Sequence, residues 1–354
     1  MVAIDTLFID GVRNISAQQI ALSAGLNFFE GRNGAGKTSV LEAAFMLSRG
    51  RSFRSFGARA CLQRGRDSAI VRAHRGAEVL GLERRIGTWS ARADGVELSS
   101  LADVSRLLPA MLFHPETHGD FFGEADQRRR TLDWAVFHVE PGFAAVWRAH
   151  QRAVRQRNAA LVSNEPFQAP MWNPAMSREG AELNALREGV FARVAAEFTA
   201  IHRELDDDAR TVSLAFRRGW ADGSTLESAI DTAWERDLAA GYSTVGAHRA
   251  DLSMTALELR AASTLSRGEG KLAVLSLILA IGAVVQPALD RPMLLLLDDL
   301  PAELDSTRLT RLLGLLGRSG YQILASGVAC PDLSEWPREH ALFHVEQGKI
   351  DRVL

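Results

Sequence analysis

Two apolar runs predict buried strands, and each run ends at polar residues of distinctive chemistry. Residues 26–30 have the composition of a buried strand, the Gly-rich segment 31–38 follows at once, and residues 39–47 then show apolar side chains at helical spacing. Much later, the five apolar residues 293–297 are followed by a pair of aspartates. Such runs are typical of parallel strands, whose carboxyl ends lie at the edge of a sheet where ligands bind.

The rest of the pattern divides the chain into strand-rich and helix-rich parts. Short alternating runs at 4–15, 68–73 and 79–85 predict antiparallel strands. Apolar residues at helical spacing then predict helices over 127–134, 143–161 and 178–205, with a linker where Pro166, Pro170 and Pro174 interrupt the pattern. The apolar segment 272–285 is shorter than the roughly twenty residues that span a bilayer, so it predicts a buried helix.

Composition limits the class of protein further. A chain of 354 residues exceeds the size at which one core keeps growing, so we expect one large lobe or two unequal lobes. A formal net charge of −2 provides no overall attraction to nucleic acid, and any DNA site must therefore be a local patch. The two cysteines lack metal or redox spacing and the N-terminus lacks a basic leader, which predicts a cytoplasmic location and no membrane partner.

The segment from Gly31 to Thr38 reads G-x-x-x-x-G-K-T between a strand and a helix, which is the context of a phosphate-binding loop. Only three of the 41 basic residues are lysines, yet this position keeps Lys37, where a compact ammonium is wanted between two phosphates. A Gly-rich turn that ends in Lys-Thr by chance is the alternative. The residues expected to bind ATP here are Gly31, Arg32, Asn33, Gly34, Ala35, Gly36, Lys37, Thr38 and Ser39.

The aspartate pair after residue 297 has the pattern of a Walker B strand. We expect Asp298 and the Thr38 hydroxyl to hold Mg²⁺, and Asp299 to orient or deprotonate the attacking water. Lys37 and Asp299 are therefore the predicted catalytic residues. A turn or a helix cap is the alternative interpretation of Asp-Asp taken alone.

Residues 265–269 resemble the signature motif of ABC ATPases and stand directly before a long apolar helix. Ser266 and the Gly268 N–H are expected to bind a γ-phosphate by the chemistry of a helix N-terminus. Ser266 is also a good helix N-cap, which is the simpler interpretation of this short motif. In the ABC superfamily the signature closes over the nucleotide of a second protomer, which implies an ATP-dependent homodimer.

Longer stretches of the chain resemble the RecF family over nearly the whole length. The matching stretches are 28–42, 50–54, 129–134, 156–161, 246–252, 265–268 and 298–305. The resemblance implies an α/β fold: an ABC-type P-loop ATPase head, with a mixed sheet and an antiparallel subdomain, that carries an inserted compact helical lobe. On this interpretation residues 1–125 and 263–354 form the ATPase lobe and residues 126–262 form the helical lobe.

The resemblance also implies what the protein does. Family members are ATP-dependent dimers that bind gapped DNA and junctions of single and double strands, act with RecO and RecR, and help to load RecA; slow ATP hydrolysis then serves release. The sequence departs from the family pattern at Glu269, where Gln is usual, and at Pro301 before the predicted D-loop. If Glu269 faces the phosphate, its charge is expected to weaken closure of the dimer.

Arginines supply the candidate DNA contacts, because arginine binds phosphate without reading base sequence. The candidates are Arg51, Arg54, Arg59, Arg128, Arg129, Arg130, Arg148, Arg152 and Arg155. The last three share one helical face by their i, i+4, i+7 spacing. Two other functions stay open: the nucleotide-binding subunit of an ABC transporter, although Ser326 stands where a switch histidine is expected, and a nucleotide-gated scaffold with negligible turnover.

Overall fold

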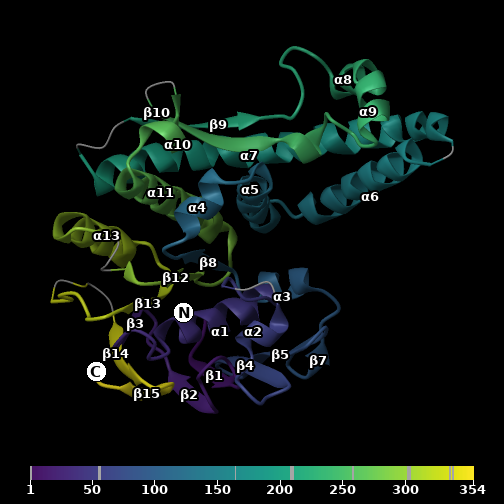
Figure 1. Cartoon of the computed structure of the whole chain (residues 1–354). Helices are drawn as coiled ribbons and strands as arrows, with labels where there is room; N and C mark the ends of the chain where they lie inside the picture. The colour runs from purple at the N-terminus through teal and green to yellow at the C-terminus, as the bar shows by residue number, and fades with distance from the viewer. Residues whose placement is uncertain are drawn as a thin grey trace. The chain divides into compact units, whose positions relative to one another are not determined.

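The computed structural model forms two compact units, of residues 1–117 with 289–354 and of residues 118–288 (Figure 1). The structure describes residues 2–54, 57–163, 165–207, 211–256, 259–300, 304–334, 336 and 339–354. The second unit begins before the predicted boundary at 126 and extends past that at 262, because the helix after the signature motif packs along another helix of this unit. Pro301 lies outside the described residues.

The first unit is built around a six-stranded sheet in the order β15-β14-β3-β13-β12-β8. All neighbours in it are parallel except the β14–β15 pair. The strands are β3 (Leu26–Glu30), β8 (Ala110–Phe113), β12 (Leu294–Leu297), β13 (Gln322–Gly327), β14 (His340–Glu346) and β15 (Lys349–Arg352). Every residue of β12 and β13 is buried, which confirms the interpretation of the apolar run 293–297 as an interior strand.

A second sheet of the same unit is antiparallel, in the order β2-β1-β4-β5-β6-β7. Its strands are β1 (Thr6–Asp10), β2 (Gln18–Ala21), β4 (Ser68–Arg75), β5 (Glu78–Arg85), β6 (Trp89–Ala93) and β7 (Val96–Glu97). β1, β4 and β5 confirm the three alternating segments. Apolar residues of both sheets and of helix α1 (Lys37–Arg49) share one buried core.

Helix α1 carries the P-loop lysine at its first position and ends at Gly50 in the left-handed conformation, with φ of 68°. A Cβ at Gly50 would lie 2.2 Å from Leu101 Cδ2, so both the backbone and the packing favour glycine there. The other helices within the described part of this unit are α2 (Ala58–Cys61), α3 (Leu101–Leu107) and α13 (Ser306–Arg318).

The second unit is mainly helical, as predicted. Its helices are α4 (Thr117–Phe122), α5 (Ala125–Val139), α6 (Phe143–Leu161), η1 (Pro166–Trp172), α7 (Asn173–Leu205), α8 (Leu226–Thr232), α9 (Trp234–Ala240), η2 (Ala247–Arg249), α10 (Ala261–Thr264), α11 (Arg267–Val285) and η3 (Gln286–Ala288). The predicted linker is itself helical: η1 is a 3-10 helix that leads directly into α7. Pro166 and Pro174 occupy first-turn positions, where proline's missing N–H costs nothing.

A small antiparallel sheet in the order β11-β10-β9 accompanies the helices of this unit. Its strands are β9 (Val212–Arg217), β10 (Asp251–Ala256) and β11 (Leu259–Arg260). β9 and β10 pair along their whole length although more than thirty residues separate them in the chain. No short-range turn signal marks such a pairing, and the sequence pattern therefore missed it.

Helix α11 is the interior helix of this unit and packs along α7 (Figure 1). Residues 267–288 are long and apolar enough to cross a membrane by length and composition, but 72% of the apolar window is buried within the protein. The imidazole of His202 on α7 meets the hydroxyl of Ser276 on α11 at 3.0 Å, so a polar contact also joins the two helices. These contacts support the prediction of a core helix over 272–285.

Two histidines of the second unit, the buried His150 and the half-buried His248, lead to a prediction about the pH dependence of stability. Burial lowers the pKa of His150 to about 3 and that of His248 to about 4, with Arg187 near the first and Arg249 and Arg129 near the second adding to the effect. Asp237 and the carbonyl of Ser243 oppose the shift of His248 without cancelling it. Both rings are therefore neutral in the folded protein at neutral pH.

The folded pKa values lie below the unfolded value of 6.5, so the unfolded chain binds protons first as the pH falls. The contribution of the two histidines to the free energy of unfolding is expected to be fully present above pH 6.5. Between pH 6.5 and the folded-state pKa of each histidine, it should fall by about 1.4 kcal/mol per histidine for each pH unit. Urea unfolding at pH 7, 6 and 5 measures the slope. His150→Leu should flatten it, the exposed-site control His344→Gln should not, and an unchanged slope in His150→Leu would contradict the assignment.

Candidate nucleotide site

The P-loop connects β3 to α1 and takes its shape from three glycines with positive φ. Gly31, Gly34 and Gly36 have φ of 152°, 80° and 122°. Gly31 also lies against β14, since a Cβ there would come within 2.3 Å of the Val345 carbonyl oxygen. The loop thus has the strand–loop–helix context that its sequence predicted, and α1 begins within it.

Lys37 places its ammonium beneath the loop. The residue is 7% exposed, and Nζ donates to the carbonyl oxygens of Gly31 at 2.7 Å and Arg32 at 3.1 Å. An ammonium has three N–H donors, so these bonds hold the group in place and leave one donor. Arg32, Asn33 and Gly34, in contrast, form the exposed crest of the loop.

Asn14 braces the end of the loop and was missed by sequence reasoning. Its Nδ2 donates to the Ala35 carbonyl at 2.9 Å, and its Oδ1 accepts from the Ser39 hydroxyl at 3.2 Å. The Gly348 N–H donates to the same Ala35 carbonyl at 2.7 Å. These contacts join segments far apart in the chain, and no local pattern in the sequence around Asn14 predicts them.

The Walker B carboxylate meets the P-loop hydroxyl, as the sequence predicted. Thr38 Oγ1 donates to Asp298 Oδ1 at 2.9 Å, and Asp298 is 6% exposed at the carboxyl end of β12. Its backbone N–H donates to the Phe113 carbonyl of β8 at 2.8 Å. The predicted partners Thr38 and Asp298 are thus adjacent although they are 260 positions apart in the chain.

Ser326 completes this carboxylate cluster. Its hydroxyl donates to Asp298 Oδ1 at 2.6 Å and accepts from the Asp299 N–H at 3.0 Å. Asp299 follows directly and has a left-handed backbone with φ of 55°. The sequence marked Ser326 only as a departure from a switch histidine, and its contact with both aspartates was not foreseen.

The signature segment forms a helix N-terminus with a capping box. Ser266 is the N-cap of α11: its Oγ accepts from the Glu269 N–H at 3.3 Å, and Glu269 Oε2 accepts from the Ser266 N–H at 2.7 Å. The capping role is therefore present, and Ser266 and Gly268 are also exposed. The Glu269 carboxylate thus binds the N-terminus of its own helix, a role that a glutamine could also fill.

The candidate DNA arginines separate into two groups. Six of them are exposed, and among the described residues no ion pair engages them: Arg51, Arg54, Arg59, Arg148, Arg152 and Arg155. The Arg128 guanidinium, in contrast, binds both oxygens of Asp251 at 2.8 and 3.0 Å. Arg129 donates to the Ala250 carbonyl at 2.7 Å, and Arg130 pairs with Asp126 at 2.7 Å. The donors of Arg128 and Arg129 thus bind residues of the second unit, and contact of these two arginines with DNA stays a prediction.

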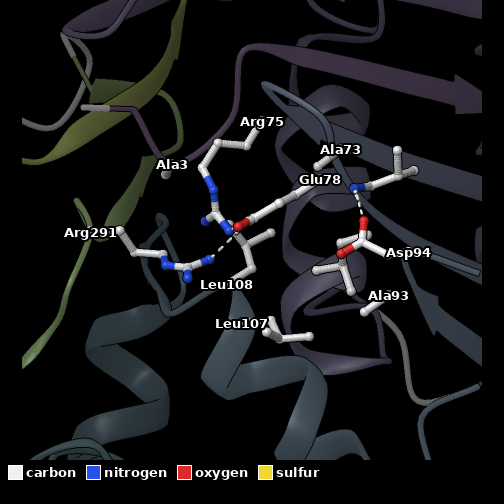
Figure 2. A pocket seen from close by; sticks show the side chains of 11 residues that line it. Ala3, Ala73, Arg75, Glu78, Ala93, Asp94, Leu107, Leu108 and Arg291 are labelled. Carbon is white, nitrogen blue, oxygen red and sulfur yellow. Dashed lines mark hydrogen bonds and ion pairs between the residues drawn. The ribbon is translucent and has the colours of Figure 1, made fainter. Parts of the chain in front are cut away.

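A separate recess of the first unit lies between the antiparallel sheet and α3 (Figure 2). Arg75 and Arg291 both approach the carboxylate of Glu78 there, the latter at 3.6 Å. The volume of the recess, about 130 Å³, is below the roughly 300 Å³ of small-molecule sites. Of its two acidic side chains, Glu78 is already paired with the arginines, and Asp94 accepts from the Val79 N–H at 2.7 Å. The P-loop, by comparison, offers the chemistry that a triphosphate needs.

The P-loop cluster fits both ATP and Mg²⁺. Glycines at left-handed φ values and the N-terminus of α1 supply N–H groups for phosphate oxygens, and a buried ammonium supplies a positive charge. A hydroxyl beside a buried carboxylate is the donor set that Mg²⁺ has in P-loop proteins, and Thr38 and Asp298 provide it. These residues would hold the nucleotide and its metal.

The sequence of the chain is similar to those of known proteins. The RecF/RecN/SMC N-terminal domain family matches residues 3–351. The DNA replication and repair proteins RecF of Shewanella sp. strain MR-4 and Shewanella oneidensis are each 33% identical over 353 residues, covering 97% of this chain and 98% of theirs.

Solved structures share the fold. A recombination mediator protein RecF of the RecFOR pathway, with ATP, superposes with a TM-score of 0.86 at 19% identity, covering 99% of this chain and 97% of that one. The Smc head domain from Pyrococcus furiosus gives 0.60 at 15% identity, covering 99% of this chain and 95% of that one. These similarities confirm the predicted ATPase-head fold, and with the sequence matches they show that the chain belongs to the RecF family.

Proposed function

We propose that this protein is an ATP-dependent DNA-binding protein of recombinational repair and replication. The observation that carries the proposal is the cluster in which the buried Lys37 ammonium lies under the P-loop and the Thr38 hydroxyl meets Asp298. The name that the Shewanella relatives carry, DNA replication and repair protein, supports the choice of process.

In this proposal each side chain of the cluster has one task. The P-loop N–H groups and Lys37 bind the β- and γ-phosphates, while Thr38 and Asp298 hold the metal. Bound Mg²⁺ would neutralise charge on the phosphate oxygens. Asp299, next to Asp298, orients or deprotonates the attacking water and so makes the protein a slow ATPase.

Besides being hydrolysed, the bound ATP would join two protomers into a dimer. Ser266 and Gly268 are exposed at the start of α11, where helix N–H groups can bind the γ-phosphate of the ATP that a second protomer holds. ATP then holds two protomers together, and hydrolysis releases them. DNA with gaps or junctions is the proposed ligand of the dimer, and RecO and RecR are its proposed protein partners in assisting RecA; the RecFOR pathway named for the ATP-bound structure supports this placement.

Sedimentation velocity tests the proposal most directly. Wild-type protein with ATP and Mg²⁺ should sediment as a dimer, and a gapped duplex should shift that dimer further. With ADP it should return to a monomer. Monomeric protein under all three conditions would contradict the proposal, and co-purification with a membrane partner after detergent extraction would favour a transporter subunit instead.

The exposed arginines of α6 provide a prediction about DNA. Replacing Arg148 and Arg152 by alanine should lower DNA affinity and flatten the dependence of log Kd on log salt by about one to two units, because each phosphate contact releases roughly one counterion. Fluorescence anisotropy over a salt series measures the slope. The control Arg178→Ala removes an exposed arginine of α7 that already pairs with Glu179, and an unchanged slope in the α6 variant would exclude this face.

A further inference from the structure

Ser326 occupies a place in the fold from which it reaches both halves of the nucleotide site. It lies near the end of β13, between β3, which leads into the P-loop, and β12, which leads to the aspartate pair. In the register of these parallel strands Ser326 pairs with Phe29, and Ala325 pairs with Leu297. Ser326 is therefore level with Asp298 at the carboxyl edge of the sheet.

The Ser326 hydroxyl uses both its donor and its acceptor capacity within the site. It donates to Asp298 Oδ1 at 2.6 Å and accepts from the Asp299 N–H at 3.0 Å. Thr38 donates to the same Oδ1 at 2.9 Å. Two hydroxyls thus bind one oxygen of Asp298 and turn its second oxygen away from themselves, which sets the orientation of the carboxylate.

The hydrogen bond from the Asp299 N–H to the Ser326 hydroxyl holds the backbone conformation of Asp299. Asp299 is not a glycine, yet its φ is 55°, a left-handed conformation that is uncommon for residues other than glycine. The next residue, Leu300, is 1% exposed and anchors the turn in the core, while Asp299 itself stays partly exposed. An acceptor fixed in β13 therefore holds the turn that presents the Asp299 carboxylate.

The geometry points to Ser326 as the positioning residue of the carboxylate pair, a role that rests on the proposed function of this site. Ser326 is 1% exposed and its short side chain is committed to Asp298 and Asp299, so it acts through them and not on a phosphate. A histidine at this position could extend to a ligand, whereas a serine fixes the metal-binding carboxylate and the water-orienting carboxylate in one arrangement.

Ser326→Ala tests the inference, with Ser326→Thr as the conservative variant. The alanine variant should bind ATP in EDTA within about threefold of wild type, because Lys37 and the P-loop glycines are unchanged. Its kcat should fall roughly 10- to 100-fold and the Mg²⁺ concentration for half-maximal turnover should rise, since both carboxylates lose their orientation. Ser326→Thr keeps the hydroxyl and should recover most of both values.

Ser48→Ala is the matched control. Ser48→Ala also removes a hydroxyl from a 0%-exposed serine of this unit, at the far end of α1 from the P-loop, and should leave kcat and the Mg²⁺ dependence as in wild type. Unchanged kcat and Mg²⁺ dependence in Ser326→Ala would overturn the inference while the proposed function stands.

A crystal structure of Ser326→Ala tests the positioning role of Ser326 without a measurement of turnover. We expect the Asp298 carboxylate to rotate and the left-handed Asp299 turn to relax. If both keep their wild-type conformation, the inference is wrong even where the wild-type protein hydrolyses ATP. If wild-type protein binds no ATP, the proposed function fails, and the conformations of the two aspartates in the variant still decide the role of Ser326.

Discussion

Lys37→Ala is expected to weaken ATP binding by roughly a hundredfold or more. A hydrogen bond between a charged donor and an acceptor contributes about 1.5–3 kcal/mol, and the variant also loses the buried positive charge that the proposed site offers to the phosphates. Lys37→Arg should lose affinity as well, because the buried site that holds a compact ammonium at 7% exposure does not admit a planar guanidinium. Isothermal titration with ATP and Mg²⁺ measures both variants.

Lys349→Ala is the natural control, because Lys349 is 70% exposed in its side chain and pairs with Asp351 at 2.9 Å. It should bind ATP as wild type does. Asp299→Asn separates binding from turnover, since the amide keeps the shape of the side chain and removes its basicity. It should bind ATP, fail to release phosphate and accumulate as the ATP-bound dimer. Wild-type affinity in Lys37→Ala would refute the assignment of the site, and a monomeric Asp299→Asn with ATP would refute the proposed closure.

Arg157→Ala is expected to destabilise the protein by about 3–5 kcal/mol. Arg157 and Asp237 are both 0% exposed in their side chains and meet at 2.7 Å. The arginine also donates to Asn173 at 2.8 Å and Ser243 at 2.7 Å. Its removal leaves the Asp237 carboxylate buried without its cation, and burial of an unpaired charge is one of the most costly changes in a folded protein.

The surface pair of Arg218 and Glu188 provides the matched control, since their side chains are 45% and 37% exposed. Arg218→Ala should destabilise the protein far less than Arg157→Ala, because solvent screens an exposed pair. Urea unfolding followed by circular dichroism compares the two variants through their midpoints at a common m value. The double variant Arg157→Met with Asp237→Leu should recover part of the loss. Equal destabilisation by Arg157→Ala and Arg218→Ala would show that the buried pair is not the source of stability.

The secondary structure around the local motifs was predicted correctly from the sequence, because it depends on the types and spacing of consecutive residues. The P-loop needs glycines, a lysine and a hydroxyl at set spacings, and the apolar run before Asp298 requires a strand with two buried faces. The capping box of Ser266 and Glu269 is local too, and the capping interpretation was open from the start.

Side-chain partners at long range were decided only by the tertiary structure. In the sequence, Arg128 and Arg129 have the same charge as the exposed arginines of α6, and nothing near them distinguishes the two groups. In the structure, Asp251 lies 2.8 Å from Arg128 although it is 123 positions away in the chain. Ser326 was interpreted from the residue it replaces and not from the aspartates it binds.

The sequence by itself determined the strand–loop–helix context of the P-loop segment and the strand before the aspartate pair, since both follow from the spacing of neighbouring residues. The ATPase-head fold was predicted from the resemblance of longer stretches to the RecF family. The tertiary structure alone decided which hydroxyl orients the carboxylates, which asparagine braces the loop and which arginines remain available to a ligand. The physical reason is that a hydrogen bond depends on distance in space, and residues hundreds of positions apart, such as Thr38 and Asp298, meet only when the sheet has formed.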